Sequence, residues 1–339
     1  MPELAAPDAP LLRVRDLRVS FATRQGALRA VDGLSFDVGR KEIVGIVGES
    51  GSGKSVAMYS MLGLVREKNV TISGSVAFEG REILGLSDKE LQPIRGGSIG
   101  MIFQDPMTAL TPVYTVGWQL AEQIRQHQQL SKAHARERAI DLLGQVGIPD
   151  PRSRVDRYPH ELSGGMRQRV VIAMALSCNP RLLIADEPTT ALDVTTQAQI
   201  LDLMLTLQDS YDSSIIIITH DMGVVAELAH RVVVMYAGRP VEIAPELDLV
   251  RRPRHPYTWG LLDAVPRISV ARERLRTIRG NAVSPLNLPP GCAFAPRCDY
   301  AMDVCRERPD LLGDEIHQAA CWLSDDQRVS IRGSHEGVS

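Results

Sequence analysis

The sequence has no apolar run that approaches the roughly 18 residues of a membrane-spanning helix. Its first ten residues, MPELAAPDAP, contain neither the basic part nor the apolar part of a secretory signal. Five cysteines in 339 residues are too few and too unevenly placed for a secreted disulfide scaffold. We therefore expect a chain that stays in the cytoplasm. This expectation is compatible with docking against a membrane protein.

An excess of positive charge is also missing. The 38 Lys and Arg residues and 41 Asp and Glu residues give a net charge of -3 at pH 7. Composition thus gives no electrostatic basis for nonspecific DNA binding, and nucleic acid is not expected as a main partner. The hydrophobic share of 44% can supply a core, and the length favours one large domain with a smaller appendage.

A glycine-rich stretch, GESGSGKS at residues 48–55, fits the pattern G-x-x-x-x-G-K-[ST]. It lies between a short β-branched run, residues 43–47, and a segment typical of a helix. In such a loop, backbone N–H groups surround phosphates, Lys54 reaches the β- and γ-phosphates, and the Ser55 hydroxyl ligates Mg²⁺. The predicted nucleotide contacts are Gly48, Ser50, Gly51, Gly53, Lys54, Ser55 and Val56.

Two carboxylates end the apolar run LLIADEP, residues 182–188. Beside a phosphate loop, a carboxylate at the end of a strand can hold Mg²⁺ through water, and the next one can polarise the attacking water. We assign Asp186 to the metal and Glu187 to the general base. If the motif stood alone, a solvated acidic turn would be the alternative, less favoured interpretation.

The stretch LSGGMRQR, residues 162–169, contributes a second anion cradle, because Ser163, Gly164 and Gly165 precede an expected helix. One nucleotide does not need two such cradles in the same chain. We therefore expect this cradle to serve a nucleotide that is held by another copy or by a partner.

Hydrophobic patterning predicts an α/β fold. Residues 11–47 alternate as in antiparallel strands, a further strand pair is expected near residues 73–80, and residues 120–146 are predicted as one helix. The region from residue 107 to about 170 is expected to be a mostly helical insertion. Short β-branched runs separated by helical segments then indicate a parallel sheet, the runs being RLLIADEP, SSIIIITHD and RVVVMYAG.

The order of six motifs resembles the nucleotide-binding subunit of an ATP-binding cassette (ABC) transporter: GESGSGKS, IFQDP, LSGGMRQR, LLIADEP, ALDV and IITHD. The resemblance covers about residues 11–245. It implies a P-loop NTPase cassette over residues 1–247, with a RecA-like core, an antiparallel β subdomain and a helical subdomain near residues 107–172. It also implies ATP and Mg²⁺ as ligands.

This resemblance further implies roles for single residues. Gln104 would contact Mg²⁺ or water and face a transmembrane partner, Ser163 and Gly165 would grip the γ-phosphate across a dimer, and Asp193 would couple the two sites. His220 would contact the γ-phosphate, and the alternative is a surface histidine after a strand. Since Glu187 and His220 are both present, we expect an active hydrolytic site.

Phe21 lies where the family stacks an aromatic ring on adenine, and a core Phe in a strand is the alternative. Residues 251–266, RRPRHPYTWGLLDAVP, resemble the extension of oligopeptide and dipeptide importer ATPases, as does QDPMTALTPVYTVGWQL. One small departure is Ala-Leu-Thr-Pro at residues 109–112, where the family usually has Ser-Leu-Asn-Pro. We expect an oligopeptide-transporter-type C-terminal domain at residues 248–339.

The same resemblance implies the partners: a second ABC ATPase, for which a distinct chain is favoured, two transmembrane permease subunits and an extracytoplasmic peptide-binding protein. The chain would be a peripheral protein on the cytoplasmic face of the inner membrane. Two alternatives remain open. The cargo could be nickel, glutathione or a glycoside, or the chain could be a soluble ABC ATPase of DNA repair or translation, which the single cassette and the mild acidity disfavour.

The C-terminal region also contains a cluster of cysteines. Four thiolates within about thirty residues can bind Zn²⁺ or an iron–sulfur cluster. No C-x-x-C pair is present, and PPGCAFAPRC suits loops around a larger group. The resembling subgroup is associated with a [4Fe–4S] cluster, which we favour over zinc or the absence of a metal. Cys178 is expected to be a core residue, and the proposed ligands are Cys292, Cys298, Cys305 and Cys321.

Overall fold

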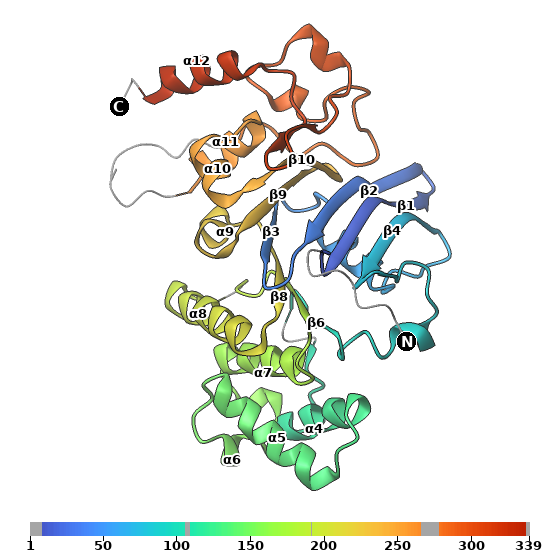
Figure 1. Ribbon diagram of the computed structural model, residues 1–339, viewed down its shortest axis with the longest axis vertical. Helices are drawn as coiled ribbons and strands as arrows, with labels where there is room; N and C mark the ends of the chain where they lie inside the picture. The colour runs from blue at the N-terminus through green and yellow to red at the C-terminus, as the bar shows by residue number, and fades with distance from the viewer. Residues whose placement is uncertain (1–8, 106–108, 191, 266–277, 337–339) are drawn as a thin grey trace.

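The computed structural model describes residues 9–105, 109–190, 192–265 and 278–336 (Figure 1). Within these residues two sheets form the core: a four-stranded sheet in the order β2-β1-β4-β5 and an eight-stranded sheet in the order β11-β12-β10-β9-β3-β8-β7-β6. The smaller sheet comprises β1 (Leu12–Thr23), β2 (Gly26–Val38), β4 (Val70–Phe78) and β5 (Arg81–Glu82). The larger comprises β3 (Ile43–Val47), β6 (Ile99–Ile102), β7 (Leu182–Asp186), β8 (Ser214–Thr219), β9 (Arg231–Tyr236), β10 (Arg239–Pro245), β11 (Leu312–Gly313) and β12 (Gln318–Ala319).

The predicted parallel sheet is confirmed. Strand β3 pairs in parallel with β8 and β9, and β7 pairs in parallel with β6 and β8. Every residue of β3, β7 and β8 is buried. These strands are continuous apolar runs because both faces of the sheet are covered. Ile43 and Val47 point into one core cluster, while Val44 and Ile46 point into the other.

The predicted antiparallel strands are confirmed as well. Strand β1 pairs antiparallel with both β2 and β4, and its buried and exposed residues alternate over much of its length. The strand pair that was expected near residues 73–80 is β4 with the short β5. This sheet lies beside the larger one (Figure 1).

Helices make up most of the region between β6 and β7. The chain there contains α4 (Val116–His127), α5 (Lys132–Gln145), α6 (Pro151–Arg154) and α7 (Gly164–Leu176), and Figure 1 shows α4–α6 gathered at one end of the molecule. The prediction of a single helix over residues 120–146 was wrong. Gln128 is extended, and Ser131 caps a new helix by accepting the His134 N–H at 3.3 Å.

The remaining helices cover the sheet or belong to the C-terminal region. They are α1 (Lys54–Met61), α2 (Asp88–Leu91), α8 (Val194–Tyr211), α9 (Met222–Leu228), α10 (Glu246–Arg251), α11 (Pro256–Asp263) and α12 (Asp325–Glu336). Among the residues that the structure describes, none of the helices combines the length and apolar character that crossing a membrane requires.

The C-terminal region continues the larger sheet. Strand β12 pairs antiparallel with β10, with Glu242 opposite Ala319. The expected boundary near residue 247 is therefore a change of composition within one continuous sheet. Cys178, expected in the core, is half-buried just after α7, where burial raises the pKa of its thiol.

Candidate functional site

The phosphate loop joins β3 to α1. Gly51 and Gly53 have φ values of 77° and 97°, in the left-handed region that favours glycine. A Cβ atom at Gly53 would lie 2.2 Å from the carbonyl oxygen of Ala30, and one at Gly48 would lie 2.2 Å from that of Met235. The glycines of the motif are thus required by close backbone approach as well as by the turn itself.

Lys54 begins α1 and is almost completely buried, with 5% of its surface exposed. Its Nζ donates hydrogen bonds to the carbonyl oxygens of Gly48 at 2.6 Å and Glu49 at 3.0 Å. Burial lowers the pKa of Lys54, although the carboxylates of Asp186 and Glu187 oppose this effect. The ammonium group is therefore held against the loop that the motif predicts as the phosphate cradle.

The two predicted Mg²⁺ ligands Ser55 and Asp186 lie together. Ser55 Oγ donates to Asp186 Oδ1 at 3.0 Å, and Tyr59 Oη donates to Asp186 Oδ2 at 2.8 Å. Asp186 is fully buried at the end of β7, and burial raises its pKa. The sequence analysis missed Tyr59, although its position one helical turn after Ser55 places it on the same face of α1.

Glu187 is the centre of a hydrogen-bonded cluster that contains all three predicted catalytic residues. Its Oε1 lies 3.1 Å from His220 Nδ1, and its Oε2 accepts hydrogen bonds from Gln104 Nε2 at 3.2 Å and Thr190 Oγ1 at 2.9 Å. Burial alone would raise the pKa of Glu187, but the contacts with His220 and Thr190 hold it below its ordinary value. Glu187 is therefore ionised at neutral pH, as a general base must be.

Backbone strain also marks Glu187, whose φ is 47°. A non-glycine residue in this region is uncommon and is often found at functional sites. The Glu187 N–H donates to the carbonyl oxygen of Ile218 at 2.8 Å, which ties this turn to β8. Thr190, which the sequence analysis did not single out, comes from the same turn and orients the carboxylate.

The second predicted cradle lies at the start of α7. Ser163 caps this helix by accepting the Met166 N–H at 3.3 Å, and a Cβ atom at Gly164 would meet open space. Ser163 and Gly164 are both exposed. In the described part of the chain we find no hydrogen bond between residues 163–165 and the phosphate loop, so the two cradles are separate features of one subunit.

Three other predicted nucleotide contacts lie on nearby elements. Asp193 caps α8 by accepting hydrogen bonds from Thr196 N at 2.9 Å and Thr196 Oγ1 at 2.8 Å. Phe21 and Val56 are partly buried against the core beneath the antiparallel sheet. The Phe21 side chain packs against this core and keeps part of its surface exposed.

The four C-terminal cysteines converge. All of them line one small cavity of about 20 Å³, together with His255 and Phe294. They are free thiols and half-buried, and burial raises the pKa of Cys298 to about 12. Among the described residues, no group of three or more His, Cys, Asp or Glu side chains is arranged to hold a metal ion.

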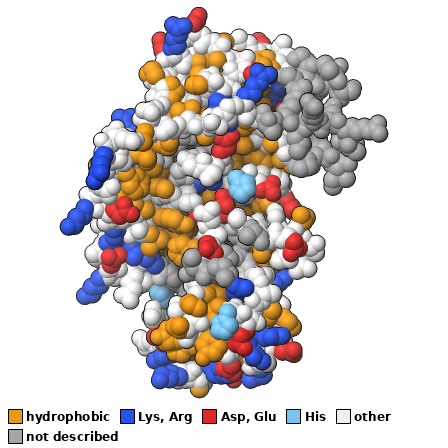
Figure 2. All heavy atoms as spheres, turned by 180° about the vertical axis from the view of Figure 1, so that it is seen from behind, with side chains coloured by type: hydrophobic (Ala, Val, Ile, Leu, Met, Phe, Trp, Pro, Cys, Tyr) orange, Lys and Arg blue, Asp and Glu red, His pale blue; other side chains and the backbone are white. Residues whose placement is uncertain are grey.

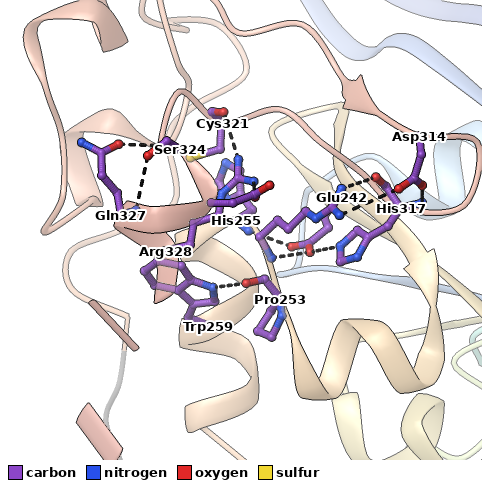
Figure 3. Close-up of polar contacts among 12 residues, drawn as sticks. Glu242, Pro253, His255, Trp259, Asp314, His317, Cys321, Ser324, Gln327 and Arg328 are labelled. Atoms are coloured by element: carbon purple, nitrogen blue, oxygen red, sulfur yellow. Dashed lines mark hydrogen bonds and ion pairs between the residues drawn. The ribbon is translucent and has the colours of Figure 1, made fainter. Parts of the chain in front are cut away.

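A buried carboxylate anchors this region to the larger sheet (Figure 3). Glu242 of β10 has no exposed surface, and its oxygens accept hydrogen bonds from the N–H groups of Arg254 at 2.6 Å and His255 at 2.9 Å. His317 Nε2 lies 2.8 Å from the same carboxylate. Figure 3 also shows Arg328 of α12 reaching the carbonyl oxygen of Cys321.

A phosphate loop after the buried strand β3, with Asp186 and Glu187 at the end of β7 two strands away in the same sheet, defines a nucleotide-binding cassette. A profile described as ABC transporter matches residues 31–190, and one described as oligopeptide/dipeptide transporter, C-terminal region, matches residues 241–305. The solved dimeric cassette MJ0796, in a post-hydrolysis state with ADP and Pi, superposes with a TM-score of 0.63 at 26% identity, covering 69% of this chain and 98% of that one.

Relatives give a narrower assignment. The chain is 51% identical to the dipeptide transport ATP-binding protein DppD of Bacillus subtilis, over 93% of this chain and 95% of that protein. It is 52% identical to the oligopeptide transport ATP-binding protein OppD of Salmonella typhimurium, over 90% and 91%. The chain belongs to this family of ABC transporter ATP-binding subunits, and it is an ABC-type ATPase.

Proposed function

We propose that this chain is the ATP-hydrolysing subunit that powers import of dipeptides or oligopeptides. The observation that carries the proposal is the cluster in which Gln104, His220 and Thr190 surround the ionised Glu187, one residue after Asp186. Relatives that share about half of its residues are named as dipeptide and oligopeptide transport proteins. The match to the transporter C-terminal region supports the same cargo class.

In the proposed reaction, Glu187 accepts a proton from the water that attacks the γ-phosphate, and Gln104 and His220 hold the carboxylate and that water in place. Lys54 and the loop N–H groups bind the β- and γ-phosphates. Ser55, Asp186 and Gln104 would hold Mg²⁺, which neutralises charge that develops on the phosphates. The other nucleotide contacts we propose are Phe21, Gly48, Ser50, Gly51, Gly53 and Val56.

We further propose that two cassettes close on ATP. Ser163 and Gly164 are exposed, Gly165 is half-buried, and we propose that all three grip a nucleotide bound to a partner cassette. Asp193, at the exposed start of α8, would couple the two sites. The partner cassette is proposed to be a distinct chain.

Two permease subunits and an extracytoplasmic peptide-binding protein complete the proposed complex, with this chain on the cytoplasmic face of the inner membrane. Exposed apolar side chains offer a docking surface: Val113 is 70% exposed, and Trp118 is 49% exposed and stacked on Tyr114. Figure 2 shows apolar side chains gathered along one side of the rear face and again at its lower end, where the helices of the insertion lie.

For domain organisation we propose a nucleotide-binding part over residues 1–247, with the helical subdomain near residues 107–172, and a C-terminal part over residues 248–339. The change in composition near residue 247 supports the division. Continuity of the larger sheet through β10 and β12 means that the two parts are expected to fold as one unit.

We propose that the four C-terminal cysteines hold a [4Fe–4S] cluster. Four thiols that line one cavity match the donor set of such a cluster, and the lack of a C-x-x-C pair in the sequence disfavours zinc. The cavity of about 20 Å³ that they line has room for little more than a water molecule, so binding of a cluster would move the cysteine side chains apart. The cluster would supply a covalent link among loops at residues 292–321, so we propose a structural role.

The test of the proposed function is peptide-stimulated ATP hydrolysis by the complete complex in lipid vesicles. Hydrolysis should rise with a peptide-loaded binding protein and should be lost in Lys54→Ala. Stimulation by nickel, glutathione or a glycoside, with none by peptides, would reassign the cargo while leaving the ATPase role in place. ATP hydrolysis that is independent of permease subunits and stimulated by DNA or ribosomes would overturn the transport role.

A further inference from the structure

Glu49 is a residue of the phosphate loop that is not among the predicted nucleotide contacts, and its side chain pairs with Arg297 of the C-terminal region. Its carboxylate accepts two hydrogen bonds from Arg297, Nη1 to Oε2 at 2.6 Å and Nη2 to Oε1 at 2.9 Å. This bidentate geometry is the strongest form of an Arg–carboxylate pair. The side chain of Arg297 is 6% exposed and that of Glu49 is 28% exposed, so the pair is sheltered from water.

The backbone of Glu49 is held from the same side. Its N–H donates to Tyr257 Oη at 2.8 Å, and Tyr257 is completely buried in α11. The two contacts bridge 208 and 248 residues of sequence. The carbonyl oxygen of Glu49 in turn accepts a hydrogen bond from Lys54 Nζ at 3.0 Å. Displacing Glu49 would therefore move a direct partner of the lysine that is proposed to bind phosphate.

Arg297 lies between residues that line the cysteine cavity, Ala295 and Cys298. It directly precedes Cys298, and its guanidinium lies over the rings of Tyr236 and Phe294 at 5.8 and 6.0 Å. Phe294 lines the cavity and contacts the Tyr257 ring, with centroids 5.4 Å apart. One short segment, residues 292–298, thus carries two cysteines and the group that holds the phosphate loop.

We infer that Arg297 and Tyr257 are positioning residues for the phosphate loop. Through these two residues, the conformational order of the cysteine-bearing segment 292–298 sets the affinity of the loop for ATP. The inference rests on the proposed nucleotide-binding role of the loop. The loop N–H groups must converge on the phosphates, and small displacements of such groups are costly. Since coupling free energy is reciprocal, bound ATP must in turn stabilise segment 292–298.

The experiment compares the full-length chain with three variants that each remove one contact: Glu49→Gln, Arg297→Lys and Tyr257→Phe. Lysine keeps the charge of Arg297 but cannot form the bidentate pair. Each variant should weaken binding of a fluorescent ATP analogue about fivefold to tenfold, and KM should rise more than kcat falls. Glu49→Gln combined with Arg297→Lys should cost no more than the larger single effect, since both remove the same pair.

The matched control is Arg306→Gln, which follows Cys305 as Arg297 precedes Cys298, but whose side chain is 86% exposed. It should leave affinity for the analogue unchanged. Unchanged affinity in all three test variants, with a lowered melting temperature, would reduce the contacts to ordinary packing and overturn the inference. If the wild-type chain binds the analogue no better than Lys54→Ala does, the proposed nucleotide role fails first, and the inference falls with it.

A second readout tests the link to the cysteine segment. ATP should slow hydrogen exchange in peptides that contain residues 292–298 in the wild-type chain, and the slowing should be largely lost in Arg297→Lys. Exchange in this segment that does not respond to ATP in the wild-type chain, at concentrations that saturate the analogue site, would contradict the coupling even if the three variants bind ATP poorly.

Discussion

Asp186 and Glu187 are neighbours in the chain, yet their environments move their pKa values in opposite directions. Burial raises the pKa of Asp186, which has no exposed surface. Hydrogen bonds from His220 and Thr190 lower the pKa of Glu187 despite partial burial. Groups whose pKa values are pushed apart in this way commonly have different tasks in one site, which agrees with the metal binding proposed for Asp186 and the proton transfer proposed for Glu187.

Glu187→Gln should lower the rate of ATP hydrolysis by a factor of about 10² to 10⁴, which is the range for loss of a general base. Binding of ATP should persist, because the loop and Lys54 are untouched, and the variant should accumulate with its partner cassette as a closed ATP-bound dimer. Lys54→Ala, by contrast, should weaken binding itself. Single-turnover hydrolysis and analogue binding measure the two effects, and normal hydrolysis in Glu187→Gln would show that Glu187 is not the base.

His255 gives a pH dependence to stability. Burial lowers its pKa to about 4, against an ordinary value of 6.5. Below pH 6.5 the unfolded chain takes up a proton on this side chain, while the folded chain keeps it neutral. The contribution of neutral His255 to the free energy of unfolding is therefore complete above pH 6.5. It is lost as the pH falls toward 4, by roughly 3 kcal/mol at most.

His255→Asn should flatten that part of the pH profile. Asparagine can still accept the Tyr257 N–H that His255 Nδ1 accepts at 3.0 Å, so the cap of α11 is kept while the titrating group is removed. Urea midpoints at pH 7.5 and pH 5 measure the difference. An equal fall in midpoint for the two proteins would mean that other groups dominate acid unfolding.

At the scale of elements, β10 connects the nucleotide-binding core to the C-terminal region. Glu242 on this strand accepts hydrogen bonds from two backbone N–H groups and approaches His317, with no water access. Glu242→Gln replaces one acceptor oxygen with a donor and should lower the free energy of unfolding by about 2 to 4 kcal/mol. Chemical denaturation measures this, with the exposed Glu315→Gln as a control that should change stability by less than about 0.5 kcal/mol. Equal effects in the two variants would contradict the anchoring role.

The helical insertion shows what sequence patterning misses at this scale. Polar residues over 120–146 favour one helix by composition, but the extended Gln128 and the capping Ser131 divide the segment into α4 and α5. The local signal was present, since a serine before a new helical turn is a typical N-cap. The parallel strands were easier to predict, because burial on both faces leaves unmistakable β-branched runs.

For the whole molecule, iron and sulfide analysis of protein purified without oxygen tests the cysteine site. About four irons and four sulfides per chain, with absorption near ~400 nm, are expected for the proposed cluster. Cys298→Ser should lose most of the iron. Cys178→Ser should keep it, because Cys178 follows α7 and does not line the cavity. One zinc per chain and no colour would replace the cluster by a single-ion site.

The sequence by itself determined the local motifs of this protein: the phosphate loop, the two carboxylates, the second anion cradle at residues 163–165 and His220. Each could be recognised because its residues are adjacent in the chain. Only the tertiary structure decided which distant residues meet. Tyr59 reaches Asp186, four cysteines line one cavity, and Arg297 holds Glu49 across 248 residues. Local motifs reflect backbone geometry and ligand chemistry, which need few neighbours, whereas long-range pairs depend on how strands and loops pack, and no local pattern records that.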